Sequence, residues 1–270
     1  MGIITISRGS YSYGKEIAEK VATRLGYGCI SREVLLEASK DFNIPEFKLF
    51  HAVADAPSVL ERILYTKDKY IAYIQAGVLK CLKKDNVVYH GFAGHFFVKD
   101  VSHVLKVRII ANLDTRISLV MERDGVSREE AIDAIHKVDE DRKKWSEQLY
   151  GIDARDPVLY DLVIHIDKLT VGNAVDIICQ NAGLEQFQTT PESQQQMEDL
   201  FLAAEVKAAL IKLKPDIEVT AHQGSVLVWT KAPVYKESKL IQDMKRIGQN
   251  VPGVKEVHID MLPISPYAID

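Results

Sequence analysis

The sequence predicts an α/β protein in which helices cover a parallel β-sheet, followed by a small α+β domain. Short apolar, β-branched segments near residues 3–6, 27–30, 86–89, 104–111 and 161–166 alternate with segments of helical periodicity. This alternation is typical of parallel sheets covered on both faces, because a crossover helix joins each strand to the next. A glycine-containing loop of the phosphate-binding type follows the first strand. After residue 200 the pattern changes to helix–strand–strand–helix–strand.

The loop after the first strand is the most informative stretch. Residues 9–15 read Gly-Ser-Tyr-Ser-Tyr-Gly-Lys, which fits G-x-x-x-x-G-K between an apolar strand and a helix that starts near Gly14. In P-loop NTPases such a loop wraps its backbone N–H groups around a phosphate, with the helix N-terminus behind it and the Lys in front. The glycines are expected to supply positive φ and close backbone approach. We therefore expect phosphate binding by Gly9, Ser10, Tyr11, Ser12, Tyr13, Gly14 and Lys15.

Two features of this loop leave room for another interpretation. Glu16 stands where a Ser or Thr ordinarily ligates Mg²⁺. A surface turn with an exposed Lys15 would also fit these letters. The position between a strand and a helix favours the phosphate loop.

Composition excludes several classes of protein. With 47% apolar residues the 270-residue chain can build proper cores, and a net charge of -4 argues against bulk nucleic-acid binding. Cys29, Cys81 and Cys179 are odd in number and widely spaced, which favours reduced thiols. No membrane-length apolar run and no signal-peptide layout occur. We expect a cytoplasmic protein that does not bind nucleic acid.

Residues 33–84 have an almost wholly helical pattern, interrupted at Pro45 and Pro57. Tyr65, Tyr70 and Tyr73 could stack on a base, but aromatic residues on a helix face more often belong to a core, and we favour the core.

A predicted helix–break–helix follows the strand at 104–111. Asp124-Gly125 ends the first helix, and Ser127 to Glu130 form a capping box that starts the second, from Glu129 to about Gln148. Basic residues surround this break: Arg116, Arg123, Arg128, Arg142, Lys143 and Lys144. They fit a lid over a phosphoryl-transfer site, which needs positive charge and exclusion of water. They equally fit a solvated charged helix pair, because acidic residues are interspersed.

His90 and His95 flank a Gly-Phe-Ala-Gly loop, but no third ligand stands at a suitable spacing. We therefore predict no metal site there. No Ser/His/Asp or Cys/His pattern points to nucleophilic catalysis.

The C-terminal part forms a second pattern. Residues 185–199 are polar and contain a Gln triplet, which predicts a linker. Beyond it come a helical stripe at 202–213, a hairpin around Gln223-Gly224, a second helix near 240–247 and a strand near 254–259. These 70 or so residues are enough for a domain that folds alone.

Residues 1 to about 183 resemble the cytidylate kinase-like family of P-loop nucleoside monophosphate kinases. The resemblance rests on Ile-Thr-Ile-Ser-Arg-Gly-Ser at 3–9 with Gly-Lys-Glu-Ile-Ala at 14–18, and on Asn-Val-Val-Tyr-His-Gly-Phe-Ala-Gly at 86–94. It also rests on Leu-Lys-Val-Arg-Ile-Ile-Ala at 105–111, Asp-Glu-Asp-Arg at 139–142 and Tyr-Asp-Leu-Val-Ile-His-Ile-Asp at 160–167. A Glu after the loop cation is familiar in this family, so Glu16 agrees with it.

The resemblance implies a kinase domain at 1–184, with an acceptor subdomain at 31–85 and a lid at 116–148. It implies that ATP, with Mg²⁺, is the phosphate donor and that a nucleoside monophosphate, CMP or dCMP, is the acceptor. Residues 9–16 and Arg116 would bind the donor, and Lys15, Arg123 and Arg142 would act in catalysis. Residues 200–270 resemble a BON-type domain, a module associated with phospholipid or small-ligand binding, through Val206 to Leu210, Gly224 to Val228 and Val251 to Val257.

One departure from the family concerns the acceptor. Cytidylate kinases have a Gly-Arg pair after the third strand, and here the pair is Gly91-Phe92. An Asp that would hold Mg²⁺ through water is also missing from the end of that strand. Other cations would have to bind the acceptor phosphate, and the candidates near the predicted acceptor subdomain are Arg32, Arg62, Lys67 and Lys69.

The resemblance leaves three functions open. The first is an ATP-dependent nucleoside monophosphate kinase whose C-terminal domain is regulatory. The second is a non-catalytic ATP sensor that controls ligand or membrane contact by that domain, which Phe92 favours. The third is a kinase for another small phosphorylated acceptor, since fold does not fix substrate.

Overall fold

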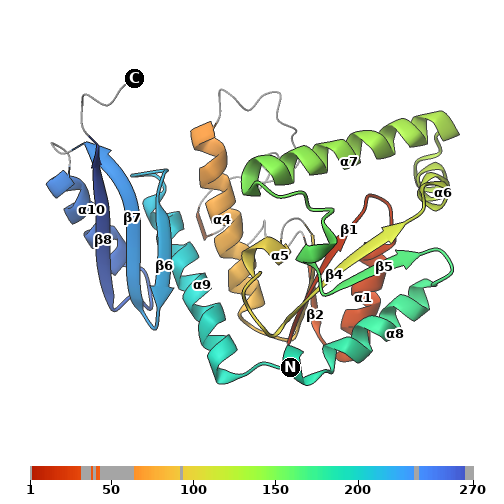
Figure 1. The fold of residues 1–270 in the computed structure, drawn as a ribbon, viewed down its shortest axis with the longest axis horizontal. Helices are drawn as coiled ribbons and strands as arrows, with labels where there is room; N and C mark the ends of the chain where they lie inside the picture. The colour runs from red at the N-terminus through yellow and green to blue at the C-terminus, as the bar shows by residue number, and fades with distance from the viewer. Residues whose placement is uncertain are drawn as a thin grey trace. The chain divides into compact units, whose positions relative to one another are not determined.

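The computed structural model describes residues 2–31, 38, 41–42, 64–91, 94–233 and 237–264 (Figure 1). Contacts divide this chain into two compact units. The first contains the described residues of 2–31, 84–91 and 94–190, and the second contains those of 38–42, 64–83 and 191–264.

The first unit is built on a five-stranded sheet in the order β2-β3-β1-β4-β5, with every neighbouring pair parallel. The strands are β1 (Ile3–Arg8), β2 (Gly28–Ile30), β3 (Val87–His90), β4 (Val104–Ala111) and β5 (Leu162–Ile166). The predicted α/β fold with a parallel sheet is confirmed. Because β1 lies between β3 and β4, their carboxyl ends meet at one edge, where ligands bind in open parallel sheets.

Helices α1 (Gly14–Leu25) and α8 (Val171–Ala182) cover one face of this sheet (Figure 1). Side chains alternate along each strand, so Ile4, Ile6, Val107 and Ile109 join the core beneath these helices. The alternate residues of β1 and β4, Ser7 and Arg108 among them, belong to the opposite face by the same alternation. Buried polar side chains, Ser7 and Arg108 among them, are thereby placed on the face opposite to α1 and α8.

The predicted helix–break–helix is present as α6 (Leu113–Asp124) and α7 (Arg128–Tyr150). Gly125 ends α6 with φ 66°, a left-handed conformation that glycine adopts at little cost. Ser127 and Glu130 form the capping box that starts α7. The two helices share a small apolar cluster: Ile117, Val120, Ala131 and Ile135. The short helix α5 (Gly94–Phe97) follows β3 at the carboxyl edge, and the short helix η2 (Pro157–Leu159) leads into β5.

The second unit contains α4 (Leu64–Leu82), α9 (Pro191–Leu210), β6 (Glu218–His222), β7 (Ser225–Pro233), α10 (Glu237–Gln249) and β8 (Glu256–Ile264). Its sheet has the order β6-β7-β8, with β6 antiparallel and β8 parallel to β7. Val206, Val228, Met244 and Val257 lie in its core. The predicted α-β-β-α-β order of the small C-terminal domain is therefore present.

Residues 185–199, predicted as a linker, instead contain η3 (Glu185–Phe187) and the start of α9 at Pro191. Proline is well placed at the first helical position, and the Gln triplet and Met197 are good helix formers. Met197 is fully buried, so this part of the segment belongs to a packed helix and is not a solvated linker.

The predicted acceptor subdomain, 31–85, lies mostly outside the described residues, which include only 31, 38, 41–42 and 64–85 of it. Its long helix α4 packs along α9 and belongs to the second unit. Tyr73 is buried there and stacks on Phe42 at a centroid distance of 4.4 Å, which agrees with a core role. Of the helices that the structure describes, none has both the length and the apolar character needed to cross a membrane.

Candidate functional site

The loop after β1 is anchored to β4 by hydrogen bonds. The Gly9 N–H donates to the Ile109 carbonyl at 2.9 Å. The buried Ser12 hydroxyl lies 3.0 Å from both the Gly9 and the Ile109 carbonyl oxygens. This side chain therefore faces the sheet, which fixes the loop at the carboxyl edge.

The backbone of this loop differs from the prediction in one respect. Positive φ occurs at Tyr11 (55°) and Tyr13 (61°), whereas neither Gly9 nor Gly14 has a positive φ. Left-handed conformations are uncommon for aromatic residues and cost roughly 1–3 kcal/mol each, and they cluster at ligand-binding loops. The prediction that the glycines supply positive φ is therefore wrong.

Gly14 is instead required for close approach. A Cβ atom at this position would lie 2.8 Å from Arg8 Cβ and 2.9 Å from Arg8 Cδ. The stem of Arg8 thus lies directly against the first residue of α1.

The two charged residues that follow the loop extend into solvent. Lys15 has a side chain that is 66% exposed, and its Nζ lies 3.7 Å from Glu19 Oε1. Glu16 pairs with Lys20 at 2.7 Å. Such exposed pairs contribute little to stability, so both side chains are available to a ligand.

Three arginines from the helix pair contact the loop segment. Arg116 Nε donates to the Ser10 carbonyl oxygen at 2.8 Å, the Arg123 guanidinium lies 4.7 Å from the centre of the Tyr11 ring, and Arg142 Nη1 donates to the Arg8 carbonyl oxygen at 3.0 Å. Arg123 also forms an exposed ion pair with Asp124, as Arg128 and Lys144 do with Asp114 and Glu140. The helix pair therefore has features of both alternatives, a lid over the phosphate loop and a solvated charged helix pair, because some of its cations contact the loop and others extend into solvent.

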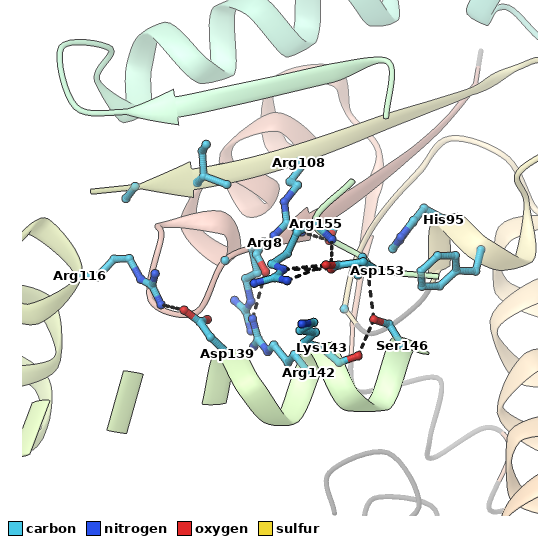
Figure 2. Close-up of a pocket in the computed structure, with 17 residues that line it drawn as sticks. Arg8, His95, Arg108, Arg116, Asp139, Arg142, Lys143, Ser146, Asp153 and Arg155 are labelled. Carbon is cyan, nitrogen blue, oxygen red and sulfur yellow. Dashed lines mark hydrogen bonds and ion pairs between the residues drawn. The ribbon is translucent and has the colours of Figure 1, made fainter. Parts of the chain in front are cut away.

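Two cavities flank the loop. The larger, which we call the loop cavity, measures about 860 Å³ and lies between residues 10–16 and the helix pair. The smaller, which we call the arginine cavity, measures about 250 Å³ and lies at the carboxyl ends of β1, β3 and β4 (Figure 2). Arg8 and Arg142 line both cavities.

The arginine cavity has more cations than anions. Its lining contains six cationic side chains, Arg8, Arg108, Arg116, Arg142, Lys143 and Arg155, but only two carboxylates, Asp139 and Asp153. Both carboxylates are engaged, Asp139 with Arg116 and Asp153 with Arg155 (Figure 2). The described residues provide no carboxylate within ion-pair distance of the other three arginines.

Burial makes these unpaired charges unfavourable. It lowers the pKa of Arg8, and burial together with the charge of Arg8 lowers the pKa of Arg142 to about 10. Removing a cation from water without a partner is costly, so an anionic ligand that pairs with these arginines would bind favourably. Arginine is well suited to bind phosphate oxygens in a bidentate manner.

A buried polar cluster forms the floor of the arginine cavity. Arg108 Nη1 lies 3.3 Å from Ser7 Oγ and 3.5 Å from the Tyr160 hydroxyl, which donates to the Ala154 carbonyl oxygen at 2.7 Å. His95 Nε2 lies 3.1 Å from the same hydroxyl. Burial, followed by repulsion from Arg108 and Lys106, lowers the pKa of His95 to about 3, so this imidazole is neutral at physiological pH.

A profile of the cytidylate kinase-like family matches residues 3–168, more than half of the chain. This chain belongs to the cytidylate kinase-like family. The match covers the loop, the helix pair and every strand of the first unit.

Individual relatives agree with this family. A cytidylate kinase of Pyrococcus horikoshii is 29% identical over 171 residues, which cover 62% of this chain and 80% of the relative. A cytidylate kinase of Pyrobaculum aerophilum is 25% identical over 177 residues, covering 66% and 90% of the two chains. A solved structure of an uncharacterized protein from Eubacterium ventriosum has a TM-score of 0.51 and 24% identity over 67% of this chain and 98% of its own, which supports the fold alone.

In this kinase-like family, Mg²⁺ accompanies the nucleotide, and the donor set near the loop suits such a role. Within the described residues no three His, Cys, Asp or Glu side chains are grouped to hold a metal ion by themselves. Mg²⁺ bound to nucleotides keeps several waters and uses one or two carboxylates beside the phosphates. Glu16, Glu19 and Glu122 line the loop cavity and are the carboxylates available there.

Sequence reasoning missed Arg8, Arg108 and Arg155 as site residues. Arg8 and Arg108 were recognisable as charges in otherwise apolar strands, one of them next to the loop glycine. Arg155 follows α7 and gives no such signal. Of the cations proposed for the acceptor, Arg32 and Arg62 lie outside the described residues, as does Phe92, while Lys67 and Lys69 lie on α4 of the second unit.

Proposed function

We propose that this protein is an ATP-dependent nucleoside monophosphate kinase that acts on CMP or dCMP in the cytoplasm. The observation that carries the proposal is that Arg8 and Arg142 line two adjoining cavities and have no carboxylate partner among the described residues. Phosphoryl transfer requires positive charge between a donor and an acceptor that are held together, and little covalent chemistry from the protein.

In this proposal the donor phosphates lie in the loop cavity. The backbone N–H groups of residues 9–15 surround them, and the exposed Lys15 swings onto the β- and γ-phosphates. Arg116 and Arg123 bind the donor from α6, and Arg142 from α7 neutralises charge as it develops. Mg²⁺, when bound, would neutralise and orient the same phosphates, with Glu16 as an outer ligand.

The acceptor phosphate lies in the arginine cavity. Arg108 and Arg155 there provide the charge that Phe92 does not. Because the second pKa of a phosphate monoester lies near 6, the acceptor is already largely a dianion, and no general base is needed. The names of the relatives from Pyrococcus and Pyrobaculum support a cytidine base.

The sensor alternative depends on Phe92 and on the second unit. If ATP binding only controlled that unit, the arginine cavity would need no acceptor. For residues 200–270 we propose a BON-like regulatory module that binds a phospholipid or a small ligand, supported by the α-β-β-α-β order of the C-terminal part of the chain. Co-sedimentation of the full chain with phosphatidylglycerol vesicles tests the phospholipid.

A coupled assay of ADP release with each nucleoside monophosphate tests the kinase. Turnover should be highest with CMP or dCMP, and Arg142→Ala should lower it roughly 100- to 1,000-fold, as expected when a preorganised cation at a transferring phosphate is removed. Arg24→Ala is the matched control, because Arg24 pairs with Asp176 and lines neither cavity. ATP binding without turnover on any acceptor would favour the sensor, and turnover on a different phosphorylated acceptor would favour the third function.

A further inference from the structure

Arg8 differs from the arginines of the helix pair in where it is attached. It is the last residue of β1, the central strand of the sheet, whereas Arg116, Arg123 and Arg142 lie on the helix pair. Its backbone is held by β4, because Arg8 stands opposite Ile109 in the parallel pair of β1 and β4. Its position therefore does not depend on the placement of a lid.

The aliphatic part of the Arg8 side chain packs directly against Gly14. A Cβ at Gly14 would meet Arg8 Cβ, Cγ and Cδ at 2.8, 3.4 and 2.9 Å, so only glycine leaves room for this side chain. Since Gly14 is the first residue of α1, the stem of Arg8 lies at the helix N-terminus, where backbone N–H groups favour anions. The second glycine of the loop thus serves to position an arginine as well as a phosphate.

The surroundings of Arg8 favour an anion between the two cavities. Arg142 Nη1 reaches the Arg8 carbonyl oxygen, so two cationic side chains lie close together without a carboxylate from the described residues (Figure 2). Both side chains line both cavities. A group that passes from one cavity to the other can therefore stay in contact with both arginines throughout.

We infer that Arg8 is a catalytic residue that contacts the phosphoryl group during its transfer, and that Gly14 holds it in place. This inference rests on the proposed function. In the step, the bond between the γ-phosphorus and the oxygen bridging to the β-phosphate breaks, and ADP leaves with the electron pair. An oxygen of the acceptor phosphate forms the new bond to phosphorus. ATP⁴⁻ and the acceptor dianion become two diphosphates of charge 3−, so no proton moves, and Arg8 acts through its charge and hydrogen bonds.

The test compares Arg8→Ala with the wild type in kcat, in KM for both substrates and in rescue by ethylguanidinium. An interaction made mainly in the transition state should lower kcat about 100- to 1,000-fold with KM changed only a few fold. Added ethylguanidinium should raise the kcat of Arg8→Ala at least about ten-fold, an effect that a purely structural role would not show. Arg24→Ala should leave kcat and KM unchanged, and ethylguanidinium should have no effect on it.

Two further variants keep the test decisive if Arg8→Ala does not fold. Arg8→Lys keeps the charge but loses the bidentate geometry, so kcat should fall at least about ten-fold. Gly14→Ala keeps the guanidinium but displaces its stem, so kcat should also fall at least about ten-fold. Unchanged kcat in folded Arg8→Lys and Gly14→Ala, or a folded Arg8→Ala with unchanged kcat or with only a raised KM, would overturn the inference and leave the kinase intact. A wild type without turnover on any nucleoside monophosphate would instead overturn the proposed function, and this inference with it.

Discussion

Acidification should destabilise the first unit through His95, which the structure keeps neutral. The ring is only 5% exposed, lies against the Tyr160 hydroxyl and faces the cationic Arg108. Protonation would place a second positive charge in this buried cluster. Folding therefore lowers the pKa of His95 from 6.5 to about 3.

The sign and size of the effect follow from this shift. A folded-state pKa below the unfolded value means that the unfolded chain binds more protons between about pH 3 and 6.5. The free energy of unfolding is therefore not reduced by His95 above pH 6.5, and it decreases progressively as the pH falls toward 3. At pH 5 the linkage relation gives a loss of about 2 kcal/mol in the free energy of unfolding.

Urea denaturation at pH 7.5 and 5.0 measures this loss. Because the chain has only two Trp residues, a Trp229→Phe background leaves Trp145 of α7 as the single Trp reporter, and it lies in the first unit. In that background, His95→Gln keeps a hydrogen-bonding side chain but removes the titration. The difference between the two pH values should then shrink by about 2 kcal/mol. An equal pH dependence in the His95→Gln variant and in its parent would show that this ring does not titrate as the structure implies.

Three other predictions test the loop, the acceptor side and the division of the chain. Lys15→Ala should weaken ATP binding at least about ten-fold in calorimetric titration and leave the melting temperature nearly unchanged, since this exposed side chain contributes little to folding; unaltered ATP affinity would exclude the phosphate loop. Phe92→Arg should raise kcat/KM for CMP in the coupled assay, because the new guanidinium can bind the acceptor phosphate through two hydrogen bonds. No gain would show that the existing arginines already satisfy the acceptor phosphate. A fragment of residues 198–270 should unfold cooperatively in urea by itself, because the core residues Leu202, Val206, Val228, Met244 and Val257 all lie within it; the absence of a transition would show that this part of the chain needs α4 to fold.

Local sequence signals predicted the elements of the first unit well. The β-branched run at 104–111 coincides with β4, and Gly125 and the capping box of Ser127 mark the ends of the helix pair. These features depend on neighbours a few residues away, so a sequence displays them directly.

Features that depend on distant contacts were missed. Residues 191–199 look like a linker because most of them are polar, yet they form the first turns of α9 and Met197 among them is buried. The membership of α4 in that unit depends on its packing along α9, about 120 residues later in the chain. Likewise, Arg8 and Arg108 become site residues only because β1 and β4 pair in the sheet.

Binding of a dinucleotide in which five phosphates join adenosine to cytidine tests most directly whether donor and acceptor occupy the two cavities together. Such a molecule would occupy both cavities and lose translational and rotational entropy only once, whereas ATP and CMP lose it separately. We predict that it binds at least about 100-fold more tightly than ATP or CMP in calorimetric titration, and that Arg142→Ala removes most of this gain. An affinity no greater than that of ATP alone would contradict the account, because the two cavities would then not accept one continuous chain of phosphates.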